Sequence, residues 1–253
     1  DLTRSDFLMI RGVLSNLSVV VGPEPGRPRD AGLAEESEML WGGTAFSTEI
    51  LPYGGSVGIE LPAMNGRLWY RRIKPKERLN TNYPVPLSAS PHWAVFGNRI
   101  AMGQSSTYRI DLFGEKGRAI GRIEQPNRNT PVSKRHWEVA LSSKNPLLID
   151  LFRDLKRAVE PPETFPEFEA LFFDTEGFVW VQLPRAATEG TVWEVFRNDG
   201  TIVGRVQTTH DFHTVLAIGS DRMVLLTFDE DWGTPLLLVL SITRSHEATD
   251  QTT

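Results

Sequence analysis

A repeated outline in the second half of the chain constrains the fold more than any other feature. The segment "IDLFGEKGRAIGRI" (110–123) returns 83 residues later as "WEVFRNDGTIVGRV" (193–206). The matching positions are aromatic residues, turn glycines and Gly-Arg pairs: Phe113 with Phe196, Gly117 with Gly200, and Gly121-Arg122 with Gly204-Arg205. One outline at a fixed spacing indicates a repeated structural unit. We interpret each copy as a hairpin of two strands around a glycine-containing turn.

Short strands surround both copies of the outline. Residues 92–126 and 168–207 each divide into four short apolar or alternating runs separated by turn residues. Residues 213–244 supply three further strands, and 6–22 supplies two strands around a Ser-Asn turn. Four-stranded sheets repeated along a chain are the blades of a β-propeller, in which neighbouring sheets cover each other's faces. In propellers an incomplete last blade is often closed by an N-terminal strand, so three strands are expected there.

One stretch is predicted to be helical, and three others to lie outside strands. In "NPLLIDLFRDLKRAV" an Asn145 cap and Pro146 precede apolar residues at helical spacing. Together with "SKRHWEVAL" it defines a helical insertion at 133–160. The Pro- and Gly-rich segment 23–37 is predicted to be a loop, 75–91 a long connection, and 245–253 a flexible tail. We therefore predict a single domain over 1–253.

The later strands also resemble a known family. The segments "FPEFEALFFDTEGFVWV", "WEVFRNDGTIVGRV" and "VLAIGSDRMVLLTFDED" resemble the closing blades of bacterial six-bladed β-propeller proteins of the NHL-related type. The segment "PHWAVFGNRIAMGQSSTYRIDLFGEKGRAIGRI" is similar to the blade before their helical insertion. The resemblance covers mainly 90–244 and implies an all-β, six-bladed propeller. Because only four to five blades fit the length, we expect N-terminal blades to be missing from this chain.

Composition excludes several classes of function. The net charge is −5, so nothing global attracts nucleic acid. There is no cysteine, which removes disulfides, thiolate metal sites and a cysteine nucleophile. No apolar run is long enough for a spanning helix. We expect a periplasmic or extracellular location, with the cytoplasm as the alternative.

Motifs that carry chemistry are weak. The "HDFH" loop at 210–213 would need a third, correctly aimed ligand to hold a metal, and we interpret it as a polar loop. The acids at 229–231 lack the calcium-loop pattern and indicate a turn. There is no Gly-x-Ser-x-Gly and no phosphate-binding glycine fingerprint. We therefore predict no catalytic, cofactor-binding or metal-binding residue, and no cofactor.

Two features are candidates for contact with a partner. The basic run at 71–78 includes Arg71, Arg72 and Lys74, which fit a docking patch or a solvated strand edge. Trp137 lies in the helical insertion, where it would either anchor a partner or pack on the propeller. We expect a non-enzymatic binding or scaffold protein, an extrinsic subunit of a larger envelope or membrane-bound complex. The alternatives are a lactonase-like hydrolase or lyase with a metal in the central tunnel, and a small glycan or peptide binder.

Overall fold

A computed structural model shows eighteen strands and two helices in the part of the chain that it describes. Those residues are 8–16, 18–23, 37–42, 48–53, 57–74, 79–142, 146–184, 190–210, 212, 214–229 and 234–243. Most of the loop predicted at 23–37 and all of the tail predicted at 245–253 lie outside the described residues.

Four antiparallel sheets form the propeller. Blade 1 contains β1 (Leu8–Val13), β2 (Val19–Pro23), β4 (Glu49–Leu51) and β5 (Ile59–Glu60). Blade 2 contains β8 (Pro91–Phe96), β9 (Arg99–Gln104), β10 (Arg109–Gly114) and β11 (Ala119–Glu124). Blade 3 contains β12 (Ala170–Phe173), β13 (Val179–Gln182), β14 (Thr191–Phe196) and β15 (Ile202–Thr208). Blade 4 contains β16 (Thr214–Ile218), β17 (Arg222–Phe228) and β18 (Pro235–Ser241).

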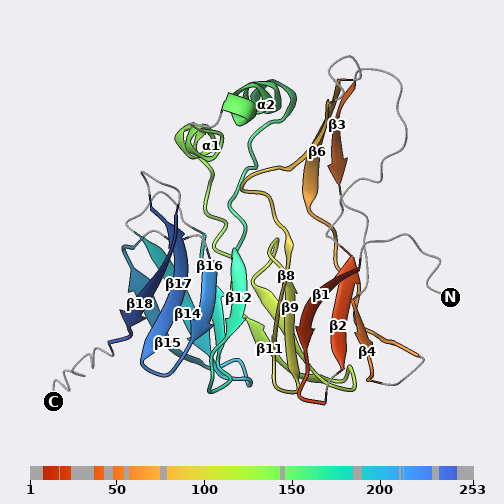
Figure 1. Ribbon diagram of the computed structural model, residues 1–253, viewed down its shortest axis with the longest axis vertical. Coiled ribbons are helices and arrows are strands. Elements are labelled where there is room, and N and C mark those ends of the chain that lie inside the picture. The colour runs from red at the N-terminus through yellow and green to blue at the C-terminus, as the bar shows by residue number, and fades with distance from the viewer. Residues whose placement is uncertain are drawn as a thin grey trace.

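The blades follow one another in sequence order from red blade 1 to blue blade 4 (Figure 1). Their first strands face inward, and β8 contacts both β1 and β12. The predicted all-β propeller arrangement is therefore confirmed. The described residues form four blades, not six, because β3, β6 and β7 build a separate sheet instead of a further blade.

Apolar side chains fill the space between neighbouring blades. Ile50 and Leu61 of blade 1 meet Ile100 and Met102 of blade 2. The next two interfaces are built in the same way, from blade 2 with blade 3 and from blade 3 with blade 4. A small sheet buries both faces only when it has a neighbour on each side. The second face of blade 4 has no such neighbour among the described residues.

The repeated outline is confirmed as the outer hairpin of blades 2 and 3. β10 and β11 shift register between Leu112 and Phe113, and β14 and β15 shift between Val195 and Phe196, the matching positions. Gly117 and Gly200 both have positive φ, at 68° and 85°, as their turns require. The two hairpins are also adjacent in space, since a Cβ at Gly200 would lie 2.6 Å from the Arg122 carbonyl oxygen.

A second unit projects beside the propeller. β3 (Ser37–Gly42), β6 (Leu68–Lys74) and β7 (Leu79–Pro84) form a three-stranded sheet, so the predicted connection at 75–91 is wrong where it includes β7. Helices α1 (Lys134–Ala140) and α2 (Pro146–Ala158) confirm the helical insertion. The Ser133 side chain caps α1 by accepting from His136 N, and the His136 ring accepts from Ser133 N in return.

Candidate functional site

The two outer hairpins carry the same acid–arginine pair. In blade 2, Arg122 Nε donates to Asp111 Oδ1 at 2.7 Å across β10 and β11. In blade 3, Arg205 Nη2 donates to Glu194 Oε1 at 2.7 Å across β14 and β15. These residues are directly opposite each other in both registers. The arginine of each repeated Gly-Arg pair therefore neutralises an acid on the preceding strand.

Blade 2 adds two further donors to the acid of blade 3. Tyr108 Oη donates to Glu194 Oε2 at 2.7 Å, and Arg128 Nη2 lies 2.8 and 2.7 Å from the two carboxylate oxygens. The Arg128 guanidinium also lies over the Tyr108 ring, 4.9 Å from its centroid. The Glu194 side chain is only 5% exposed. The carboxylate is therefore a buried polar connection between blades 2 and 3.

The loop that follows β11 brings Arg128 to this position. Gln125 N donates to the Tyr108 carbonyl oxygen, and Tyr108 N donates to Asn127 Oδ1 at 2.9 Å. The buried Glu167 carboxylate then accepts from the backbone N–H groups of Arg128, at 2.8 Å, and of Asn129. Four hydrogen bonds thus hold the loop over the blade interface, and the Arg128 side chain is positioned before any ligand arrives.

The network keeps Glu194 ionised. Burial alone raises the pKa of this carboxyl, but hydrogen bonds from Arg205, Tyr108 and Arg128 outweigh burial and leave the pKa below its usual value. Burial, followed by the bond to Glu194, raises the pKa of the Tyr108 hydroxyl. A carboxylate with three donors and a lowered pKa is a poor general base. We therefore interpret Glu194 as a structural anchor.

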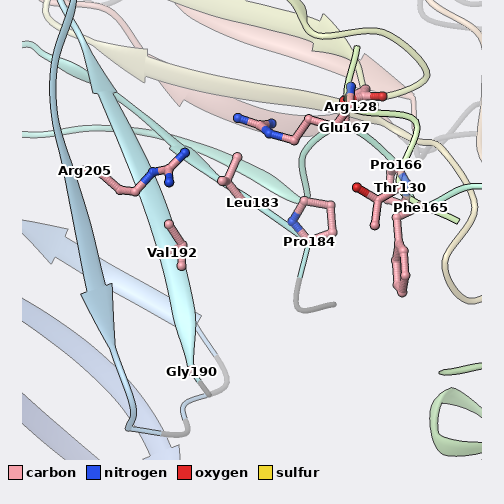
Figure 2. Close-up of a pocket in the computed structure, with 10 residues that line it drawn as sticks. All are labelled: Arg128, Thr130, Phe165, Pro166, Glu167, Leu183, Pro184, Gly190, Val192 and Arg205. Carbon is pink, nitrogen blue, oxygen red and sulfur yellow. Dashed lines mark hydrogen bonds between the residues drawn. The ribbon is translucent and has the colours of Figure 1, made fainter. Parts of the chain in front are cut away.

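A pocket of about 210 Å³ lies beside this network. Figure 2 shows Arg128 and Arg205 entering from opposite sides and pointing toward one another, with Leu183 between them. Thr130 and Glu167 add polar groups to the wall, and Phe165, Pro166, Pro184, Gly190 and Val192 complete it. Each arginine uses only its Nη2 atom in the hydrogen bonds found among the described residues. The remaining guanidinium N–H groups suit a carboxylate or another small anion.

A serine–histidine pair lies in a second pocket, of about 300 Å³, beside the start of β8. Ser90 Oγ lies 2.9 Å from His92 Nε2, and Arg67 Nη2 lies 3.4 Å from the same hydroxyl. Burial, followed by the nearby Arg67 charge, lowers the pKa of His92 to about 3. An imidazole with so low a pKa is too weak a base to activate a serine near neutral pH. In this arrangement we interpret the pair as a structural hydrogen bond at the start of β8.

A third pocket, of about 280 Å³, follows the inner strands of blades 2, 3 and 4. All its lining side chains are apolar: Trp93, Ala94 and Val95 from β8, Leu171, Phe172 and Phe173 from β12, and Val215, Leu216, Ala217 and Ile218 from β16. Leu216 is 53% exposed. We call this pocket the inner groove. Its side chains suit an apolar guest, and none of them is a carboxylate or an imidazole that would bind a metal ion.

The residues predicted to contact a partner are not brought together into one site. Trp137 is buried, with Tyr70, Leu151 and Phe152 in the core between the helices and the β6–β7 sheet, so in this structure it packs inward. Arg71, Arg72 and Lys74 lie on β6, but their side chains are outside the described residues. Partner contact at these four positions stays a prediction.

The weak metal motifs are only partly described. Asp211 and His213 of the "HDFH" loop, and Glu230 and Asp231 of the acidic turn, lie outside the described residues. His210 Nδ1 lies 3.2 Å from Thr208 Oγ1. In the part of the chain that can be searched, no three His, Asp or Glu side chains gather at one point.

Sequence reasoning missed the Glu194 network, although one signal was present. Glu194 is the single charged residue in the strand "TVWEVF", and it matches Asp111 in the repeat. An acid at the same place in both copies, each followed by a Gly-Arg pair at the same distance, predicts a cross-strand ion pair. The contributions of Tyr108 and Arg128 could not be read from the repeat, because both come from the neighbouring blade.

Comparison with known proteins adds no family to this description. No family model matches the chain, and no curated protein matches it at a significant level. None of the helices in the described ranges combines the length and apolarity needed to cross a membrane.

Proposed function

We propose that this chain is a non-enzymatic binding or scaffold protein, and that its inner groove receives apolar side chains of a protein partner. The observation that carries the proposal is that every side chain that lines the groove belongs to an apolar or aromatic residue. Protein-binding surfaces bury apolar anchors in preformed hollows that rigid elements support. Three inner strands, each held in its own sheet, provide such support here.

The same lining gives the enzymatic alternative less support than the binding function. A lactonase-like or lyase propeller holds its metal with carboxylates or imidazoles from several blades. The strands β8, β12 and β16 contain no Asp or Glu, and their one histidine, His92, is held in the Ser90 pair. A metal would therefore need ligands from beyond these three strands.

A second candidate function rests on the pocket of Figure 2. The free donors of Arg128 and Arg205 suit the carboxylate of a peptide or of an acidic sugar, which fits the small glycan or peptide binder. Glu194 and Glu167 balance the two arginine charges, so the pocket attracts an anion only weakly. For this reason we place it second.

The larger setting is also part of the proposal. A rigid propeller with an added sheet and two helices offers several surfaces for protein contact, as an extrinsic subunit of an envelope or membrane-bound complex requires. A periplasmic or extracellular location belongs to the same proposal.

A substitution in the inner groove tests the proposal. Leu216→Lys places a charge in the groove at an already exposed position, so the fold should persist while capture of the partner from native extract is lost. Ile120→Lys is the matched control, because Ile120 is 50% exposed on β11, outside the groove. Quantitative mass spectrometry of the captured proteins compares both variants with the wild type. Equal capture by all three would reject the groove as the binding site, and stoichiometric retention of a metal after dialysis would favour the enzyme.

A further inference from the structure

The outer edge of β18 differs from the corresponding edges in blades 2 and 3. β18 is the third strand of blade 4, in the position that β10 and β14 hold in blades 2 and 3. There a fourth strand, β11 or β15, pairs with it and covers its outer edge. No fourth strand accompanies β18 among the described residues.

A second observation, also limited to the described residues, concerns the position that a fourth strand of blade 4 would hold. In blade 2, a Cβ at Gly121 would collide with the Asn198 carbonyl oxygen, which belongs to the turn before the fourth strand of blade 3. The matching glycine of blade 3 is Gly204, and a Cβ there would meet nothing within 4 Å. Among the described residues, blade 4 therefore supplies neither a fourth strand nor a turn that covers β15.

Apart from Pro235 at its start, β18 has neither charged residues nor a bulge to protect its edge. The outer strands β11 and β15 carry arginine and a register shift next to glycine. The stretch "TPLLLVLSIT" at 234–243 has no charged residue, and β18 pairs with β17 over its whole length without a shift. Leu237 and Val239 are 65% and 60% exposed. An uncharged, regular and apolar edge strand is a template for pairing with another strand.

The hydrogen-bond pattern shows which groups the edge offers. The Thr234 carbonyl oxygen accepts from Asp229 N, and Ile242 N donates to the Asp221 carbonyl oxygen, so both residues direct their backbone groups toward β17. Backbone groups alternate along a strand, and the pairing is regular between these two residues. Leu237, Val239 and Ser241 therefore direct their N–H and C=O groups outward, and Pro235 directs its C=O the same way.

We propose that a second copy of this chain occupies this edge, through antiparallel pairing of β18 with β18 across a two-fold axis. The strand is nearly palindromic in residue type about Leu238, since Leu236 matches Leu240 and Leu237 matches Val239. With Leu238 on the axis, Leu237 and Val239 of the second copy exchange both backbone hydrogen bonds. The Ser241 N–H of each copy reaches the Pro235 carbonyl oxygen of the other.

Charge and position favour this occupant. No like charges meet across the axis, because the paired stretch is uncharged. The two most exposed side chains of the strand become cross-strand neighbours, and two three-stranded sheets become one continuous sheet. β1 and β18 lie at opposite ends of the row of blades (Figure 1), which separates this edge from the first strand of the same chain. A two-fold dimer is also the commonest symmetric assembly.

Light scattering after size exclusion, over a range of protein concentrations, tests the proposal. We expect twice the chain mass at the higher concentrations. Leu237→Pro removes an outward N–H that β17 does not use, and proline is tolerated on edge strands. Val239→Lys instead places a charge against an apolar side chain of the second copy. Each variant should raise the dimer dissociation constant about tenfold or more. Val203→Lys on β15, another exposed edge position, should leave it unchanged.

The outcomes separate this inference from the proposed function. Circular dichroism checks that each variant is folded. If Leu237→Pro does not fold, the dissociation constant of Val239→Lys decides the test. Hydrogen exchange should show protection of the Leu237 and Val239 amides that rises with protein concentration. A wild-type monomer at all concentrations overturns the dimer, and so does a dimer that survives both variants. Protection that is independent of concentration means that a strand of the same chain fills the edge, and it overturns the proposal too. Val239→Lys should still capture the partner of the inner groove, whereas Leu216→Lys should still dimerise.

Discussion

The outer hairpins of blades 2 and 3 share one sequence outline but have different surroundings. In blade 2, Asp111 pairs with Arg122 in partial contact with solvent, at 27% and 47% side-chain exposure. In blade 3, the matching Glu194 is buried because Tyr108 and Arg128 reach over it from blade 2. The matching glycines show the reverse pattern: Gly121 of blade 2 lies tightly against blade 3, whereas Gly204 of blade 3 has no described atom close to it. A repeated segment therefore acquires its energetic role from the blade beside it.

Removal of each acid in turn should give the largest difference in stability between the two blades. Glu194→Ala leaves the buried Tyr108 hydroxyl and two guanidinium groups without their acceptor, so we expect a loss of about 2–3 kcal/mol in the free energy of unfolding. Asp111→Ala should cost roughly a quarter of that or less, because exposed ion pairs contribute little. Urea unfolding of both variants gives the two values. Similar losses would mean that the network between the blades adds nothing to the pair within one blade.

Alanine substitution at the two glycines should cost more stability in blade 2 than in blade 3, the reverse of the acid substitutions. Gly121→Ala forces the Asn198 turn of blade 3 away from β11, and we expect a loss of about 1–3 kcal/mol. Gly204→Ala meets no atom and should change stability by less than about 0.5 kcal/mol. Thermal and urea unfolding, with both substitutions also made in the Val239→Lys background as a control for self-association, measures the two values. A large cost at Gly204 would show that another segment covers β15.

A smaller effect is expected in the dependence of stability on acid pH, to which the Glu194 carboxylate contributes. The pKa of Glu194 is lowered in the folded protein, so the unfolded chain binds its proton more readily. The carboxylate therefore contributes stability above its unfolded pKa, near 4.5, and this contribution is lost as the pH falls through the folded pKa. Glu194→Gln should flatten the stability profile below that pH when urea midpoints are compared across acid buffers. An unchanged acid slope would contradict the assignment.

The difference between the blades also explains how far sequence reasoning reached. The strands of blades 2 to 4, the helical insertion and the turn glycines were predicted, because their signals lie within short windows: apolar alternation, Asn and Gly turns, and helical spacing. The strand β7 was missed, because the prolines around it resemble those of a loop and its partner β6 determines its pairing. The number of blades also differs from the six that the resemblance implies, since the described residues form four blades and a separate β3–β6–β7 sheet.

The candidate sites depended even more on tertiary structure. The inner groove joins three segments that start at Trp93, Leu171 and Val215, far apart in the sequence, and no local pattern marks them as neighbours. The sequence left Trp137 either as a partner anchor or as a residue packed on the propeller, and the structure shows it buried between the two helices and the β6–β7 sheet.

The sequence by itself determined the repeat, the outer hairpins and the uncharged strand at 235–241, because strand propensity, turn chemistry and charge are local properties. Only the tertiary structure decided which repeat unit is covered and which is open. Glu194 is buried because blade 2 supplies Tyr108 and Arg128, and Gly204 is open because no described residue of blade 4 lies against it. A residue is buried when atoms of another part of the chain lie against it, and here those atoms come from the neighbouring blade.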